Sequence, residues 1–96
     1  MVKDVFSEQQ RLIMLQTMAE DEDYSINNEM FQPILKNFGH AISIDLINSH
    51  FNYLEEIGLI TTTPCGKFIV ATLTRRGLDV AQGVAKSPGV ARAKPF

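Results

Sequence analysis

The sequence contains no tryptophan and only one cysteine, Cys65. A single thiol cannot form a disulfide within the chain, so the small secreted folds that depend on several disulfides are excluded. Long hydrophobic runs are also missing. The longest run, at residues 68–73, has about six residues, whereas a helix that crosses a membrane needs roughly 20 apolar residues. The first residues lack the apolar stretch of a secretory signal. These absences favour a cytoplasmic protein that does not enter a membrane.

Basic side chains are scarce in the first 60 residues. This part carries three basic and ten acidic side chains, a net charge of −7, whereas residues 61–96 carry six basic and one acidic, a net charge of +5. The whole chain has 96 residues, 45% of them hydrophobic, which is the size and composition of one globular domain. The charge asymmetry does not define a fold, but it limits which partners each surface can bind.

Hydrophobic spacing and capping residues predict four helices and a β-hairpin. The expected helices are residues 7–20, with a capping box formed by Ser7 and Gln10; 27–38, begun by Asn27; 43–57, begun by Ser43; and 74–84, begun by Thr74. A short strand is expected at 24–26, and two further strands at 59–63 and 68–73 flank a turn at 64–67. Two prolines and a glycine near the end predict an extended segment. We therefore expect one domain, 1–85, followed by an extended basic tail, 86–96.

Two short motifs match a known family. Residues 54–60, LEEIGLI, resemble the L-x-x-x-G-L-I motif that ends a recognition helix and enters the wing of a winged helix-turn-helix domain. Residues 73–77, LTRRG, resemble the L-T-x-x-G motif that leaves the wing and opens the next helix. The chain thus resembles bacterial regulators of the ArsR, MarR and PadR type. Over its whole length it is similar to small winged-helix proteins of Mu-like bacteriophages and prophages.

This resemblance implies both a fold and a function. The fold is a mainly helical α+β winged helix-turn-helix, with a three-helix core, a two-stranded wing and a C-terminal helix. The function is that of a small transcriptional regulator that binds double-stranded DNA. In this arrangement the helix at 43–57 would lie in the major groove, with the preceding helix packed across it.

Polar residues on the outward face of the helix at 43–57 are the candidates for reading bases. Asn48, Ser49 and Asn52 share this face. An asparagine side chain can form two hydrogen bonds with adenine, and serine can bond to several bases. We therefore predict that these three residues contact base edges.

Three cations are the candidates for phosphate contacts. Lys67 lies in the predicted hairpin turn, and Arg75 and Arg76 begin the last predicted helix. Two arginines in a first helical turn oppose the helix dipole, at a cost of roughly 0.3–1 kcal/mol each when exposed. Such a departure from local preference suggests contact with an anion. Ordinary solubility, or pairing with acidic side chains such as Asp79, explains the same residues.

An alternative function follows from the charges of the same helix. It carries no lysine or arginine, and Asp45, Glu55 and Glu56 lie on or near its outward face. Affinity for duplex DNA depends largely on neutralised phosphates, which these carboxylates would repel. The face is therefore equally well explained as a solvated surface, or as a binding surface for another protein in a domain that does not bind DNA.

The remaining residues do not point to catalysis. His40, His50 and Cys65 fall in three different predicted elements, and a metal site needs several ligands that converge. No glycine-rich phosphate loop or catalytic set is visible, so we expect no metal, no cofactor and no enzyme activity. The helix at 7–20 is apolar on most sides, which indicates that more than one side is covered. We expect a homodimer formed through this helix and the last one.

Overall fold

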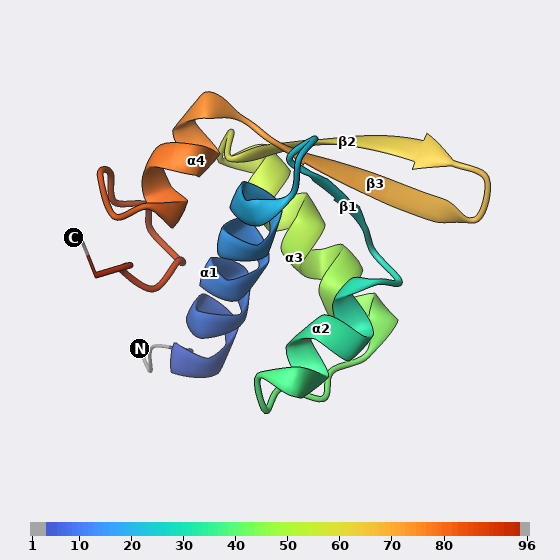
Figure 1. The fold of residues 1–96 in the computed structure, drawn as a ribbon. Coiled ribbons are helices and arrows are strands. Elements are labelled where there is room, and N and C mark those ends of the chain that lie inside the picture. Colours follow the sequence, from blue (N-terminus) through green and yellow to red (C-terminus); the bar gives the residue numbers. More distant parts are fainter. Residues whose placement is uncertain (1–3, 95–96) are drawn as a thin grey trace.

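The computed structural model describes residues 4–94, which form an α+β fold. Its elements are α1 (Val5–Glu20), β1 (Ser25–Asn27), α2 (Phe31–Asn37), α3 (Ile44–Glu56), β2 (Ile60–Cys65), β3 (Phe68–Leu73) and α4 (Arg75–Ala81). The strands of the described residues form one antiparallel sheet in the order β1-β3-β2. Figure 1 shows α1 between α4 on one side and α2 on the other, with the β2–β3 hairpin reaching away from the helices. The predicted α+β class and the predicted order of elements are confirmed.

The hydrophobic core surrounds α1. Met14, Leu15 and Met18 have no exposed surface, and burial of such a side chain contributes about 1.5–3 kcal/mol. Phe31 of α2 and Phe51 of α3 pack edge to face, with ring centroids 5.8 Å apart. The central position of α1 accounts for its broad apolar surface within a single chain. Across residues 4–94, no helix combines the length and the apolar character that a membrane crossing requires.

The start of α1 differs from the prediction. The helix begins at Val5, and Asp4 is its N-cap. The Asp4 carboxylate accepts hydrogen bonds from the Ser7 backbone amide at 3.0 Å and from the Ser7 hydroxyl at 2.8 Å, and these bonds lower the pKa of Asp4. The predicted capping box of Ser7 and Gln10 is therefore wrong. Asp4 prevails because its two oxygens accept both bonds and Ser7 then joins the helix.

The start of α2 also differs from the prediction. Asn27 does accept a hydrogen bond from the Met30 amide, at 2.9 Å, but this bond closes a turn, and α2 begins only at Phe31. Asn27 is still part of β1, where it pairs with Val70 of β3. The sheet thus holds Asn27 in extended conformation and delays the helix by four residues.

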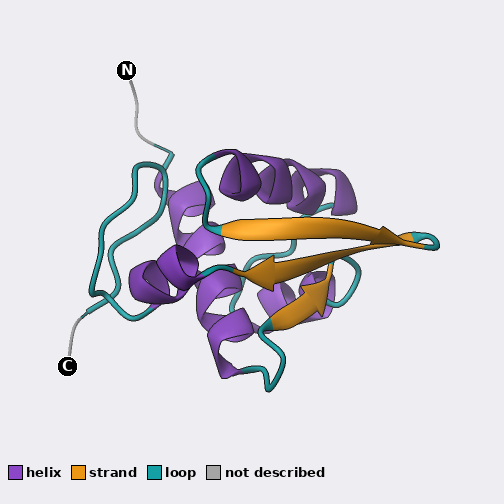
Figure 2. Cartoon of the chain, turned by 90° about the horizontal axis from the view of Figure 1, so that it is seen from above, coloured by secondary structure: helices purple, strands orange, loops and turns teal. Residues whose placement is uncertain are grey.

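The hairpin is longer than its predicted strands. Cys65 pairs with Phe68, so the connection consists of Gly66 and Lys67 only, and Gly66 has a φ of 61°. A two-residue turn with positive φ matches the twist of antiparallel strands. Pro64 and Cys65, which were expected in the turn, instead belong to β2. Figure 2 shows that the hairpin extends beyond the helices.

The C-terminal segment packs against the helices instead of extending into solvent. Val90 and Ala93 are only 8% and 4% exposed, and the Ala91 amide donates a hydrogen bond to the Glu8 carbonyl at 3.1 Å. The expectation of an extended tail is therefore corrected for residues 87–93; residues 1–3 and 95–96 of the predicted ranges lie outside the described residues. Counting prolines and glycines overlooked the apolar side chains between them. Figures 1 and 2 place this segment at the opposite end of the molecule from the hairpin turn.

Candidate nucleic-acid interface

The outer face of α3 is polar and exposed. Ser43 fixes the start of the helix, because its hydroxyl accepts a hydrogen bond from the Leu46 amide at 3.1 Å. The opposite side of the helix is buried in the core through Ile47, Phe51 and Leu54. Successive residues are rotated by about 100°, so the exposed residues centre on the side away from the core. The exposed residues of α3 are Asp45, Ser49, Asn52, Glu55 and Glu56. Ser49 and Asn52 thus lie on the outward face, as predicted.

Asn48 instead joins α3 to the sheet. Its side-chain oxygen accepts a hydrogen bond from the Asn28 side-chain amide at 2.9 Å. Asn28 is only 4% exposed, and its own side-chain oxygen accepts from the Ile69 amide of β3 at 3.1 Å. Paired recognition of adenine needs both the oxygen and the nitrogen of an asparagine side chain. The oxygen of Asn48 already accepts a hydrogen bond within the protein. Asn48 is therefore not available to pair with adenine in this way, unlike the predicted base contacts of Ser49 and Asn52.

Glu55 joins the same flank of α3 to the hairpin. Its carboxylate accepts hydrogen bonds from the Thr62 amide at 2.8 Å and from the Thr62 hydroxyl at 2.9 Å. The Thr62 amide faces the outer edge of β2, and Pro64, the next residue facing that way, has no N–H. The carboxylate and the proline therefore block this edge against further strand pairing. On β1, Asp21 accepts from the Ser25 amide at 3.2 Å and occupies an edge amide in the same way.

The arginines that begin α4 lie near the end of α3. The Thr74 hydroxyl donates to the Gly58 carbonyl at 2.8 Å, directly after α3. Arg75 and Arg76 follow Thr74 and are exposed. Arg75 Nε lies 3.7 Å from an Asp79 carboxylate oxygen, and the Arg75 side chain is 88% exposed. An exposed ion pair of this kind contributes between zero and about 1 kcal/mol to stability. Arg75 therefore interacts only weakly with Asp79.

Lys67 lies at the other end of β3 from the two arginines. It is exposed in the hairpin turn, with its Nζ 5.2 Å from the centroid of the Phe68 ring. The six residues of β3 separate it from Arg75, a length of about 20 Å at 3.3 Å per residue. The structure therefore brings Arg75 and Arg76 together near the end of α3 and places Lys67 apart from them.

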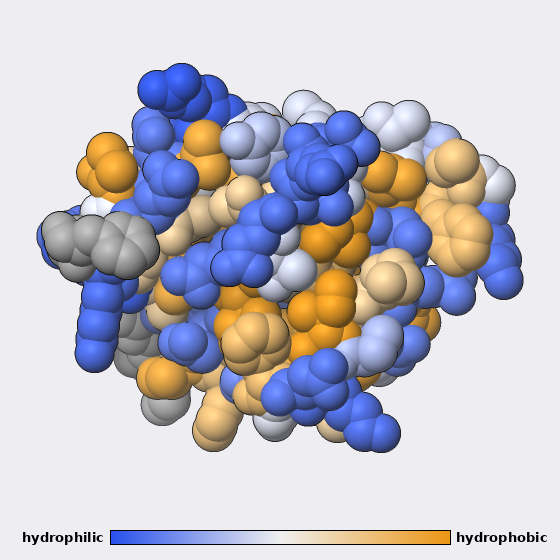
Figure 3. Space-filling view, viewed as in Figure 1, coloured by the Kyte–Doolittle hydropathy of each residue, from blue (hydrophilic) through white to orange (hydrophobic). Residues whose placement is uncertain are grey.

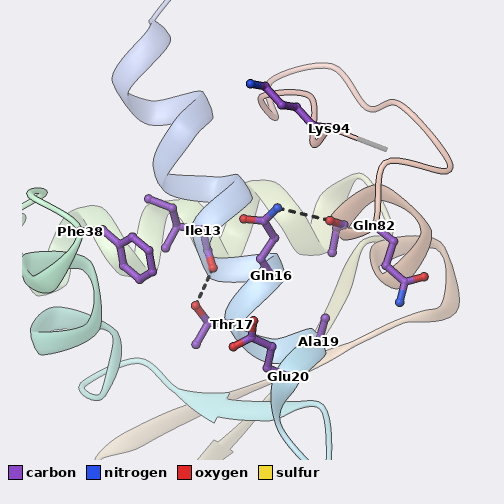
Figure 4. A pocket seen from close by; sticks show the side chains of 9 residues that line it. Ile13, Gln16, Thr17, Ala19, Glu20, Phe38, Gln82 and Lys94 are labelled. Atoms are coloured by element: carbon purple, nitrogen blue, oxygen red, sulfur yellow. Dashed lines mark hydrogen bonds between the residues drawn. The ribbon is translucent and has the colours of Figure 1, made fainter. Parts of the chain in front are cut away.

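A groove follows the exposed side of α1. Its volume is about 460 Å³, and Ile13 and Thr17 form part of its floor. Figure 4 shows Phe38 on one side of the groove and Gln82 and Lys94 on the other. Phe38 is 61% exposed despite its large ring. Figure 3 shows apolar residues gathered near the middle of this face, bordered by hydrophilic ones. The groove is thus a candidate contact surface between α1, α4 and a second molecule.

Comparison with known proteins relates the chain to a bacteriophage protein. No protein-family model matches the sequence. The chain is 36% identical over 95 residues to protein gp26 of Escherichia phage Mu, covering 99% of this chain and 98% of that protein. It is also 35% identical over 77 residues to a protein of Haemophilus influenzae, covering 79% of this chain and 74% of that protein. Both relatives are described as uncharacterised.

Proposed function

We propose that this chain, which belongs to the family of the phage Mu protein gp26, is a small winged-helix protein that binds double-stranded DNA and regulates transcription. The supporting observation is the exposed polar face of α3 beside a hairpin that projects from the body of the molecule (Figure 2). If the fold is interpreted as a winged helix, α2 and α3 form the helix-turn-helix and β2–β3 forms the wing.

Five exposed residues of the interface would contact DNA in this proposal. Ser49 and Asn52 contact base edges in the major groove, because they lie on the outer face of α3. Lys67 contacts a phosphate at the hairpin turn, and Arg75 and Arg76 contact phosphates near the end of α3. Three neutralised phosphates give a slope of log affinity against log salt of about −2.7 per chain. This electrostatic contribution is modest, so binding is expected to be weak and best seen at low salt.

Charge reversal at the start of α4 tests the phosphate contacts. The double variant Arg75→Glu, Arg76→Glu is expected to abolish binding to duplex fragments at about 50 mM salt, because two attractive contacts become repulsive. Fluorescence anisotropy with labelled fragments from phage and host regulatory regions measures the effect. Lys86→Glu, at the end of the molecule opposite the hairpin turn, is the matched control and should retain binding. If the wild-type chain binds none of these fragments at low salt, the DNA proposal is wrong.

A protein-binding role is the second candidate. The observation in its favour is that α3 carries no cation, while Asp45 and Glu56 are exposed on its outer face. A basic protein surface would pair with these carboxylates. Glu55 does not belong to this surface, because Thr62 occupies its carboxylate. This candidate would be favoured if the chain does not bind DNA but binds a basic protein, and if that binding is lost when Asp45 and Glu56 are substituted.

We further propose that two copies associate through the groove between α1 and α4. Figure 4 shows Glu20 and Lys94 toward opposite ends of the groove, so a two-fold pairing places unlike charges opposite each other. At tens of micromolar, sedimentation should give the mass of two chains. Phe38→Glu should give one chain, because it buries a charge in the contact, whereas Val84→Glu, outside the groove, should not. A wild-type mass near one chain would contradict the dimer.

A further inference from the structure

Two side chains bind the backbone of the C-terminal segment, residues 87–93, which we call the strap. The Tyr53 hydroxyl of α3 donates a hydrogen bond to the Pro88 carbonyl at 2.9 Å. The Arg11 guanidinium of α1 donates to the next carbonyl, that of Gly89, at 2.8 Å. Adjacent carbonyls of the strap are thus held from two different helices. Hydrogen bonds that involve a charged donor are roughly twice as strong as neutral ones.

Arg11 also contacts two side chains of α3, Tyr53 and His50. Its guanidinium carbon lies 4.1 Å from the centroid of the Tyr53 ring, close enough for a cation–π interaction. Its Nε donates to Nδ1 of the buried His50 at 3.1 Å. Arg11 therefore joins α1, α3 and the strap in one set of contacts.

Gly89 shows how closely the strap approaches α3. A Cβ atom added at this residue would overlap the hydroxyl and the ring of Tyr53, and would lie 2.8 Å from Cε2. Gly89 also has a φ of 76°, which side chains other than glycine rarely adopt. Two independent features thus require glycine where the strap crosses Tyr53. Val90 follows directly and is buried in the core.

We propose that Arg11 and Tyr53 form a latch that holds the strap against α3, so that residues 87–93 close the domain instead of serving as a free basic arm. The latch fixes one flank of α3, opposite to the flank that Glu55 attaches to the hairpin. Lys94, directly after the strap, forms one wall of the α1 groove. Release of the strap would therefore alter the proposed dimer surface; this consequence rests on the proposed function, whereas the latch itself does not.

Limited trypsin digestion of the full-length chain tests the latch. Trypsin cuts after Lys86 and Arg92, which flank or lie in the strap. Arg11→Met removes the donor to Gly89 and the contact with Tyr53 while keeping an apolar stem of similar length. We expect cleavage at both sites to become at least about tenfold faster under native conditions, because local opening exposes the backbone to the protease. Arg11→Lys keeps the charge but loses the planar donor arrangement, and should give an intermediate rate.

A second variant and two reference sites separate release of the strap from general unfolding. Gly89→Ala acts from the strap side and leaves Arg11 and His50 unchanged, so it should accelerate the same two cuts. In a Tyr24→Phe background, Tyr53 is the sole tyrosine of the chain, and its near-ultraviolet circular dichroism should weaken in both variants. Cleavage after Lys36 and Lys67 should keep its wild-type rate. Equal acceleration at all four sites, or unchanged cleavage of the strap in both variants, would overturn the latch.

Discussion

Lowering the pH from 7 to 4 is expected to reduce the free energy of unfolding by about 3 kcal/mol through His50 alone. The side chain is 1% exposed. Burial, followed by the nearby Arg11 charge, lowers the pKa of His50 from 6.5 to about 4, while Asp4 acts weakly in the opposite direction. Each pKa unit corresponds to 1.36 kcal/mol. A loss of this size is a large part of the 5–15 kcal/mol that stabilises a typical domain.

The hydrogen bonds of His50 explain why the folded state rejects a second ring proton. Because Arg11 donates to Nδ1, the single proton of the neutral ring lies on Nε2 and is donated to the Gln10 side-chain oxygen at 2.9 Å. The Gln10 nitrogen in turn lies 3.3 Å from Nδ1 of His40. A second proton on His50 would face the Arg11 donor directly. The contribution of His50 to stability is therefore present at pH 7 and is lost as the pH falls from 6.5 toward 4. In this range the unfolded chain binds the extra proton and the folded chain does not.

Urea unfolding between pH 4 and 7 measures this contribution. His50→Gln retains an amide that can donate to Gln10, and should remove most of the pH dependence between 6.5 and 4 while lowering stability at pH 7. His40→Gln is the matched control and should keep the contribution of His50 to the pH dependence, since His50 is unchanged. The informative quantity is the difference between the curves of the wild type and the variant, because the ionisable groups that the two proteins share contribute to both curves. Parallel curves for His50→Gln and the wild type would contradict the role given to His50.

Gly77→Ala is expected to destabilise the protein by about 3 kcal/mol or more. In an exposed helix this substitution stabilises by about 1 kcal/mol. At residue 77, however, the added Cβ would overlap the Leu59 carbonyl oxygen and lie 2.7 Å from Cδ1 of Leu73. The Leu59 carbonyl accepts the hydrogen bond of the Thr74 amide, so it cannot move away without breaking the junction between α4 and the sheet. Overpacking of this kind typically costs 1–3 kcal/mol, occasionally more.

Thermal or urea unfolding should thus show that Gly77→Ala lowers the free energy of unfolding, whereas helix propensity alone predicts that it rises. Gly66→Ala is the matched control: it adds the same methyl group where nothing lies within 4 Å. The φ of 61° at Gly66 limits the expected cost there to about 1–2 kcal/mol. If Gly77→Ala were as stable as the wild type, the close contact between α4 and Leu59 would be refuted.

Local signals predicted much of the fold. Ser43 and Thr74 cap α3 and α4 as predicted. Each is followed directly by a helix, and its hydroxyl accepts a hydrogen bond from a backbone amide in the first turn of that helix. The prediction failed where two capping residues lie close together, as with Asp4 and Ser7, or where a strand holds the candidate, as with Asn27. The L-T-x-x-G motif located α4, but only the structure shows that Gly77 is needed for close packing.

Contacts between distant residues could not be predicted. Helical periodicity placed Ser49, Asn52 and Asn48 outward, but the bond from Asn28, 20 residues earlier, occupies Asn48. The same holds for Glu55, which periodicity left free and Thr62 binds. The strap depends on Arg11 and Gly89, which are 78 residues apart. Local spacing carries no information about such pairs, so the sequence predicted a solvated tail.

An NMR titration of the ¹⁵N-labelled chain with a duplex fragment at about 50 mM salt tests whether α3 and the hairpin bind DNA together. If α3 and the hairpin together contact DNA, the amide signals of Ser49, Asn52 and Lys67 should shift in one concentration-dependent process. The shifts should shrink as salt is added, because the affinity falls. The slope of log affinity against log salt should be about −2.7. Signals that stay in place for α3 and the hairpin, or shifts confined to the groove on α1, would show that this surface does not bind DNA.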